Sequence, residues 1–202
     1  EQIRDSSRLL HISTDFVFGG DQGHPYLPED PLNPLNSYGI SKAAGEKALL
    51  HHDNSTVLRT SWMYGPVGHN FLQTMLRLHQ QKAASNEPLH VVADQVGCPT
   101  NSGDLARACW AAIERRNAGI LHWSDAGVAS WYDFAQAIGE LGEASGLIKR
   151  SAVVKPIVTS AYPTAARRPS YSLLDCTTTR AQLLLAPRHW RVALKECLQQ
   201  MI

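Results

Sequence analysis

The segments RLLHIST (residues 8–14), YGISKAAGEKALLHH (38–52) and STVLRTSWMYGP (55–66) have the character of a strand, a helix and a second strand in succession. The first and the third are short apolar runs that end in small polar or aromatic residues, which is typical of buried parallel strands. Asn36 or Ser37 can cap the helix between them. A strand that is joined through a helix to another strand predicts a parallel sheet.

The same alternation continues to the carboxyl end of the chain. Further helices are expected at 70–81, 102–116, 130–143 and 190–200, and further strands within 88–100, 119–125 and 154–163. Residues 15–36 are dense in Gly, Pro, Asn and Asp, so they predict a long loop. The pattern as a whole indicates an α/β fold with helices on both faces of the sheet.

Composition excludes several classes of function. The net charge of the 202 residues is +1, with no long basic or acidic run, so neither nucleic acid nor a membrane is expected as a partner. The amino end has no signal-peptide layout, which favours the cytoplasm, and it does not begin with methionine. Four cysteines without a CxxC pair, and nine histidines without HExxH, favour reduced thiols and no structural metal.

A candidate catalytic pair lies in the first helix. In parallel sheets ligands bind beyond the carboxyl ends of the strands, which singles out residues 13–15 and 60–65. Tyr38 and Lys42, on the helix between these segments, are four residues apart and face the same way. A nearby ammonium stabilises phenolate, so such a tyrosine can exchange a proton with a ketone oxygen, and a Ser or Thr hydroxyl can hold that oxygen. The alternative is an ordinary pair on a helix surface.

Several motifs in the same order resemble a known family. HISTDFVFGG (11–20), PLNSYGISKAAGEKAL, VLRTSWMYGP, DQVGCPT and YPTAARRPSYSLLD (162–175) are similar to segments of the bacterial dTDP-4-dehydrorhamnose reductases, which are extended short-chain dehydrogenase/reductases. The family's Ser/Thr–Tyr–Lys triad matches Thr14, Tyr38 and Lys42. Two departures, Phe16 and Gly19, leave the triad intact. Related dehydratases carry Asp-Glu after the threonine, whereas Asp15 is followed here by Phe16, so simple reduction is favoured.

The resemblance implies an NADPH- or NADH-dependent reduction of the C4 ketone of dTDP-4-dehydro-L-rhamnose to dTDP-L-rhamnose. Thr14, Tyr38 and Lys42 would be catalytic, and Ser13, Tyr38 and Lys42 would contact the cofactor. The residues expected to contact the substrate are Thr14, Asp15, Trp62, Asn70, Gln95 and Arg167. Alternatives stay open: Trp62 as a core residue, Asn70 and Gln95 as loop caps, and either Arg167 or Arg168 in a solvated or structural role. No metal site is implied, and a homodimer is possible.

The glycine-rich turn that cradles a dinucleotide pyrophosphate is missing from these residues. The nearest candidate, IGELGEASG (138–146), follows no strand and is interpreted as a helix terminus. Members of the family carry the turn before the segment matched here. We therefore expect an incomplete Rossmann-type doubly wound parallel sheet from residues 1–65 with about 101–124. Residues 66–100 and 125–202 would form most of a smaller substrate-binding lobe.

Two other functions remain as alternatives. One is a non-catalytic module that resembles the regulatory beta subunit of methionine adenosyltransferase. That subunit resembles this chain less around SWMYG and DQVGCPT, so the retained triad and Trp62 favour an enzyme. The other is a reductase or epimerase of a different nucleotide sugar, because a few hydrogen bonds in a pocket separate one sugar from another.

Overall fold

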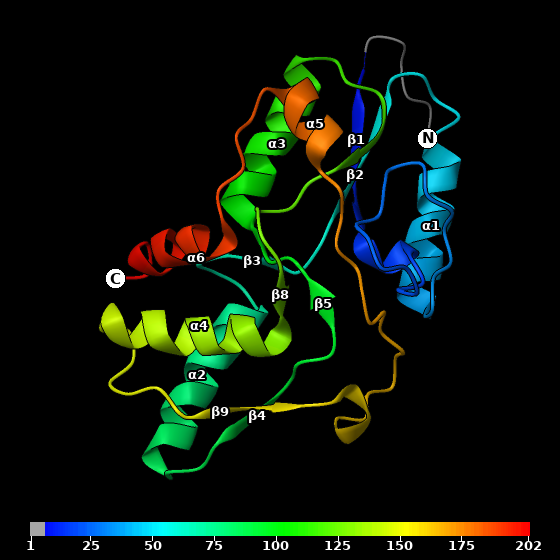
Figure 1. Cartoon of the computed structure of the whole chain (residues 1–202). Helices are drawn as coiled ribbons and strands as arrows, with labels where there is room; N and C mark the ends of the chain where they lie inside the picture. Colours follow the sequence, from blue (N-terminus) through cyan, green and yellow to red (C-terminus); the bar gives the residue numbers. More distant parts are fainter. Residues whose placement is uncertain (1–6) are drawn as a thin grey trace.

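A three-stranded parallel sheet forms one half of the molecule. The computed structural model describes residues 7–202. The strand order is β1-β2-β7, with β1 at Leu9–Thr14, β2 at Ser55–Thr60 and β7 at Gly119–His122. Helix α1 (Ser37–Leu49) covers one face, whereas α3 (Ser102–Glu114) and α5 (Thr177–Leu183) lie on the other, as Figure 1 shows. The predicted parallel α/β arrangement is confirmed.

The register of this sheet aligns polar side chains across three strands. Ser13 of β1 lies opposite Arg59 of β2, and Arg59 lies opposite His122 of β7. The preceding residue of β2, Leu58, packs against α3 and α5 in an apolar cluster with Leu105 and Leu183. Because successive side chains of a strand alternate between faces, the polar row belongs to the face that α1 covers.

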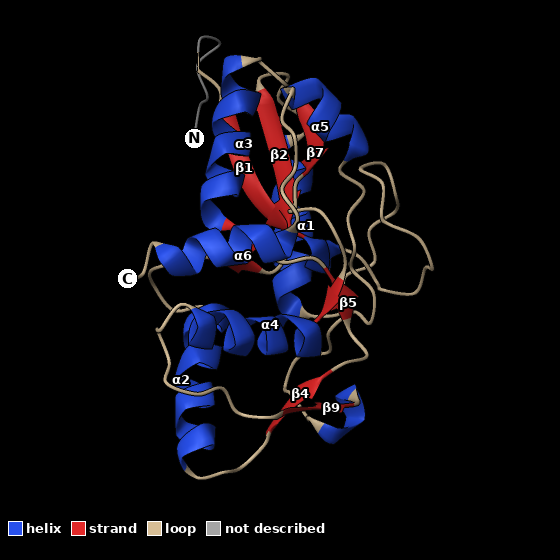
Figure 2. Cartoon of the chain, turned by 60° about the vertical axis from the view of Figure 1, so that its left-hand side comes forward, coloured by secondary structure: helices blue, strands red, loops and turns tan. Residues whose placement is uncertain are grey.

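The second half is a smaller lobe built mainly from helices. It contains α2 (Phe71–Ala84), α4 (Trp131–Ala144), α6 (Trp190–Gln199), and the parallel strands β4 (Leu89–Val92) and β9 (Val154–Ile157). Figure 2 shows these elements below the sheet. The apolar faces of the three helices meet in one core, whose fully buried members include Leu72, Phe134, Ile138, Leu194 and Leu198. Burial of these side chains is the main source of this lobe's stability.

Short strand pairs connect the two halves. β3 (Met63–Tyr64) pairs with β6 (Thr100–Asn101), and β5 (Val96–Gly97) pairs with β8 (Ala129–Ser130). Two 3-10 turns, η1 (Asp15–Val17) and η2 (Thr159–Ala161), complete the elements. The loop after η1 is anchored, because Tyr26 forms a bridge with Leu174 and packs with Phe18 in a third buried cluster.

The predicted helices are confirmed, with ends that differ by a few residues. α1 ends at Leu49, three residues before the predicted end. Ser130 caps α4 as predicted, and Asp133 completes a capping box with it. The glycines of 138–146 are the end of α4, and Gly146 follows the helix with φ +77°. β3 and β5 lie within segments that were predicted as strands, whereas α5 and β8 were not predicted. Within residues 7–202, no helix is long and apolar enough to cross a membrane.

Candidate active site

The amino-terminal turn of α1 sits directly against the end of β1. Asn36 caps the helix by accepting a hydrogen bond from the Gly39 N–H at 2.9 Å. Gly39 is required here, because a Cβ at this position would come within 2.2 Å of the Phe16 carbonyl oxygen. This close approach lets the Tyr38 ring pack edge-to-face on Phe16, with 6.1 Å between the ring centroids. Tyr38 therefore stands beside the segment that carries Thr14.

The Lys42 ammonium is held at the same strand end. Its Nζ donates a hydrogen bond to the Ile12 carbonyl oxygen and lies 3.3 Å from His11 Nε2. Burial, with help from the neighbouring Lys42 charge, lowers the pKa of His11 despite an opposing effect of Glu46. His11 is therefore neutral near pH 7 and can accept a hydrogen bond from Lys42. Tyr38 remains 56% exposed, so its phenol is accessible from solvent.

Thr14 and Asp15 form a buried hydroxyl–carboxyl pair that precedes Phe16, the residue on which Tyr38 packs. The Thr14 hydroxyl donates to Asp15 Oδ1 at 3.0 Å and accepts from the Phe16 N–H at 3.2 Å. Asp15 Oδ2 is buried and has no hydrogen-bond partner. Burial raises the pKa of Asp15 to about 6, although the nearby Ser172 and Thr14 side chains oppose the change. An unpaired buried oxygen of this kind is suited to accept a hydrogen bond from a bound hydroxyl.

Ser13 is also buried, but its side chain faces away from a possible ligand. Its hydroxyl donates to Glu46 Oε1, which lies beneath α1. Between the two hydroxyls that could hold a substrate oxygen, the structure thus favours Thr14. Only the backbone of Ser13 is left to contact a cofactor, and that role stays a prediction.

Trp62 lies at the junction of the two halves. Its indole stacks on Trp131 with 3.7 Å between centroids and an interplanar angle of 9°. Gly97 approaches the same indole so closely that a Cβ would lie 2.8 Å from it. The backbone of Trp62 has φ +46°, a region that bulky residues seldom occupy. Trp131 covers one indole face, and the role of Trp62 in binding sugar stays a prediction.

Asn70 and Gln95 are both engaged in hydrogen bonds within the chain. Asn70 caps α2 through the Gln73 N–H and also donates to the Gly65 carbonyl oxygen. Gln95 accepts from Trp131 Nε1 and donates to the Thr159 hydroxyl, each at 3.1 Å. Gln95 lines a cleft, whereas Asn70 is not among the residues that line it. The structure thus supports the loop-capping alternative for Asn70.

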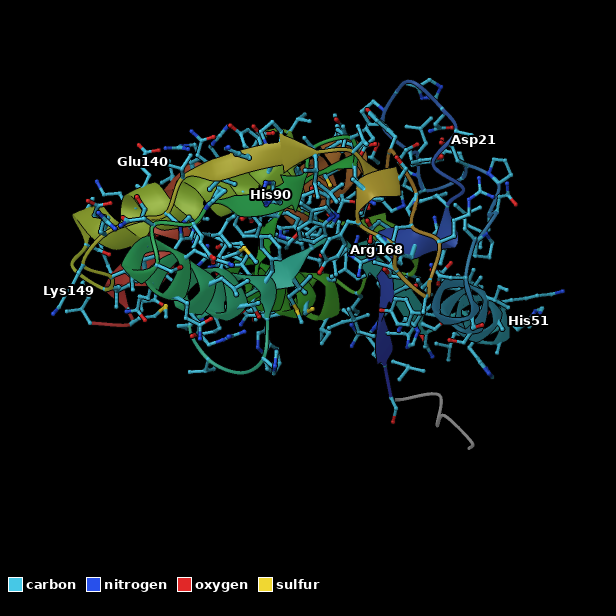
Figure 3. The ribbon with its side chains drawn as sticks, turned by 90° about the horizontal axis from the view of Figure 1, so that it is seen from below. Asp21, His51, His90, Glu140, Lys149 and Arg168 are labelled. Atoms are coloured by element: carbon cyan, nitrogen blue, oxygen red, sulfur yellow. The ribbon has the colours of Figure 1, made fainter. Side chains whose placement is uncertain are left out.

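A cleft of about 480 Å³ opens in the smaller lobe between α2, β4 and the segment 162–168. Trp131, Gln95 and Arg168 are among its lining residues. Arg167 lies outside the lining, but its carbonyl oxygen accepts a hydrogen bond from Asn36 at 2.8 Å. The segment therefore connects the cleft to the start of α1. Figure 3 shows Arg168 between the smaller lobe and the sheet half.

Three other hollows lie around Ala83, Arg150 and Ala152, at the end of α2 that points away from the sheet (Figure 1). Of these four, the cleft at Arg168 is lined by the 162–168 segment, which is hydrogen-bonded to Asn36 at the start of α1, so it is the candidate substrate cleft. Within residues 7–202, no three His, Cys, Asp or Glu side chains are placed to hold a metal ion.

Comparisons with known proteins identify the family of the chain. The family model described as RmlD substrate binding domain matches residues 3–202. The chain belongs to this family. A dTDP-4-dehydrorhamnose reductase of Aggregatibacter actinomycetemcomitans is 42% identical over 96% of the chain and 67% of the relative. A dTDP-4-keto-6-deoxy-D-glucose reductase of Streptomyces niveus is 38% identical, over 96% and 65% respectively.

A solved structure of a family relative shows the same fold. The dTDP-4-dehydrorhamnose reductase of Bacillus anthracis, in complex with NADP, is 34% identical to this RmlD-family chain, with a TM-score of 0.86. The match covers 96% of the chain and 66% of that structure. The chain thus spans about two thirds of the length of the relatives that it matches. The predicted family and Rossmann-type fold class are confirmed.

The polar network between α1 and the sheet was not predicted from the sequence. Glu46 and Arg59 are both fully buried and form an ion pair. Two signals could have revealed it. Glu46 continues the four-residue spacing of Tyr38 and Lys42, and Arg59 interrupts the apolar run of β2. Trp131, which stacks on Trp62, was predicted as helical but not as part of the site.

Proposed function

We propose that this chain supplies the catalytic residues and the sugar-binding lobe of an NADPH- or NADH-dependent reductase. The substrate would be dTDP-4-dehydro-L-rhamnose and the product dTDP-L-rhamnose. The observation that supports the proposal is that Lys42 is hydrogen-bonded to Ile12 of β1 and Tyr38 packs on Phe16, two residues after Thr14, near the carboxyl end of the strand, where parallel sheets bind ligands. The reductases among the family relatives support this choice of reaction.

In the proposed reaction the Tyr38 phenol gives its proton to the C4 carbonyl oxygen of the sugar. The reduced nicotinamide supplies the hydride that reaches C4, so the ketone becomes a secondary alcohol and the two added hydrogens are accounted for. Lys42 stabilises the phenolate that remains on Tyr38. Thr14 donates a hydrogen bond to the same carbonyl oxygen after its hydroxyl rotates away from Asp15, and this bond strengthens as negative charge develops.

The residues present fit the nicotinamide end of the cofactor. Lys42 is half-buried beside the exposed Tyr38 and carries hydrogen-bond donors that can reach a ribose hydroxyl. A cradle for the pyrophosphate is not found among residues 7–202, where no glycine-rich turn links a strand to a helix. This chain would therefore hold the reacting half of the cofactor, and the choice between NADPH and NADH stays open.

The cleft beside Trp131 would receive the nucleotide-linked sugar. It combines apolar walls from Phe71, Met75 and Leu78 with the cationic side chain of Arg168. Apolar walls suit a base and a deoxysugar, and the cation suits a diphosphate. Asp15 Oδ2, buried and unpaired, would accept a hydrogen bond from a sugar hydroxyl.

Reduction of another dTDP-4-keto-6-deoxy sugar is the second candidate. The Streptomyces niveus relative, nearly as similar as the rhamnose enzyme, acts by its name on dTDP-4-keto-6-deoxy-D-glucose. Both sugars carry a ketone at C4, so the same triad would serve either reaction. We also propose a cytoplasmic location, which suits the four free thiols of the described chain. A homodimer stays a prediction.

The proposal is tested by following NADPH oxidation in the full-length protein with each of the two keto sugars. Turnover of dTDP-4-dehydro-L-rhamnose that exceeds turnover of the D-glucose compound supports the first candidate, and the reverse order supports the second. Calorimetric titration of the chain with dTDP-L-rhamnose, and separately with NADPH, tests the alternative that the chain binds a nucleotide sugar without catalysing its reduction. Sugar-nucleotide binding without any turnover in the full-length protein would indicate a non-catalytic module and would contradict the reductase proposal.

A further inference from the structure

One stripe of α1 runs from the candidate site into the core. Tyr38, Lys42 and Glu46 follow one another at four-residue spacing, so they lie on one face of the helix. Tyr38 is 56% exposed, Lys42 is half-buried and Glu46 is 1% exposed. The buried end of the stripe is therefore a carboxylate, which needs partners to remain in the interior.

Glu46 has those partners in the polar row of the sheet. Arg59 donates from Nε to Oε1 at 3.0 Å and from Nη2 to Oε2 at 2.8 Å, which makes a two-pronged ion pair. Ser13 donates its hydroxyl to the same Oε1. Glu46 is thus bound from β1 and β2 at once, and the directions of these bonds define how α1 is rotated and tilted on the sheet.

Arg59 is held from the other side as well. Its Nη1 donates to the Pro28 carbonyl oxygen at 3.0 Å and to His122 Nε2 at 3.2 Å, and its guanidinium lies 5.1 Å from the centre of the Phe18 ring. Burial, followed by the charge of Arg59, lowers the pKa of His122 to about 3, so this histidine stays neutral. The network therefore contains one anion and one cation. It also holds the loop after β1 through the hydrogen bond from Arg59 to the Pro28 carbonyl oxygen.

We propose that Glu46, through Arg59 and Ser13, is a positioning residue that sets the place of Tyr38 and Lys42 over the end of β1. This inference rests on the proposed reductase function. Eight residues of helix separate Glu46 from Tyr38, about 12 Å. A tilt of about 5° at Glu46 would then move Tyr38 by about 1 Å, and a displacement of that size at a reacting group can lower a rate by about 100-fold.

A purely structural role for the pair would have a different signature. Replacing a buried ion pair by apolar residues of similar volume often preserves or improves stability, whereas removing one partner is strongly destabilising. The double variant Glu46→Leu/Arg59→Met is thus expected to fold. If the pair only stabilises the fold, this variant should keep its activity; if the pair positions α1, activity should be lost although stability is retained.

The test compares kcat and KM of the full-length protein with those of Glu46→Gln, the double variant and Leu58→Ala. Leu58 is a matched control, because it is buried next to Arg59 on β2 but faces α3 instead of α1. We expect kcat to fall about 10- to 100-fold in Glu46→Gln and in the double variant, with the KM for the keto sugar changed less than about threefold. Leu58→Ala should lower the melting temperature and leave kcat within about twofold. Equal kcat values in the double variant and the wild type would overturn the proposal.

A second readout does not depend on activity. Amide hydrogen exchange of the segment 38–46 reports how stably α1 packs on the sheet, and it can be measured on the chain itself. We expect exchange in this segment to become about tenfold faster in the double variant and to stay unchanged in Leu58→Ala. Unchanged exchange in both variants would refute the positioning role even if the wild type is an active reductase. A wild type without reductase activity would instead refute the proposed function, while faster exchange in the double variant would still show that Glu46 seats α1.

Discussion

The buried carboxyl of Asp15 predicts a measurable dependence of stability on pH. Its pKa is about 6 in the folded chain, compared with 3.8 for an exposed aspartate, and the main cause is burial. The folded state therefore holds this proton more tightly than the unfolded state does. The stabilising contribution is complete below pH 3.8 and is lost as the pH rises through about 6. A pKa difference of about two corresponds to about 3 kcal/mol in the free energy of unfolding.

The substitution Asp15→Asn removes this titration. The assay is urea unfolding of the chain at several pH values between 4 and 7, and the quantity compared is the slope of the free energy of unfolding against pH. Asp125, whose pKa burial also raises to about 6, contributes in the same direction in both proteins. We expect the wild type to lose about 2 kcal/mol more than the variant over this range, since part of the contribution is already lost at pH 4. Only the slopes are compared. The substitution also replaces the unpaired Oδ2 by an N–H2 group, which changes the free energy of unfolding at every pH.

Equal slopes in the wild type and Asp15→Asn would refute the reasoning, since they would mean that the carboxyl is not buried as the structure shows. Asp125→Asn serves as the matched control, because it removes a second buried carboxyl with a similarly raised pKa, one that accepts a hydrogen bond from the Asn101 N–H. It should flatten the same slope without changing the kinetics of the candidate site.

Two further substitutions test the packing around the site. Trp62→Ala removes an indole stacked on Trp131, so we expect a loss of about 3 kcal/mol in the free energy of unfolding. It should also weaken binding of dTDP-L-rhamnose more than binding of dTDP, measured by calorimetry; equal losses would mark Trp62 as a core residue only. Gly139→Ala places a Cβ 2.4 Å from the buried His79 ring, which is itself held by the Ala135 carbonyl oxygen. Its melting temperature should drop by several degrees, whereas Gly23→Ala, with open space around it, should change little.

Local patterns were enough to predict the elements that carry the site. The apolar runs of 8–14 and 55–66, and the capped helix between them, give the strand–helix–strand unit that the structure contains. Their short-range causes, a capping side chain and a continuous buried run, are visible in single segments. The two-residue strand β8 depends on a partner that is distant in sequence, so no local pattern could indicate it.

The candidate site was predicted only in part for the same reason. Tyr38 and Lys42 share a helix, so their spacing alone places them together. The ion pair between Glu46 and Arg59 joins a helix to a strand through tertiary packing, and two charged residues in sequence do not show that they are buried. Likewise, the stacking of Trp62 on Trp131 brings together residues that are far apart in the sequence. Such contacts require the fold itself.

The role of Tyr38 is the central claim, and its replacement by phenylalanine tests it most directly. Tyr38→Phe in the full-length protein keeps the ring that packs on Phe16 and removes only the hydroxyl that donates the proton. The measurement is kcat for NADPH-dependent reduction of dTDP-4-dehydro-L-rhamnose, together with the affinity for dTDP-L-rhamnose. The account predicts that kcat falls by about 100-fold or more while the affinity changes less than about threefold. An unchanged kcat would contradict the account.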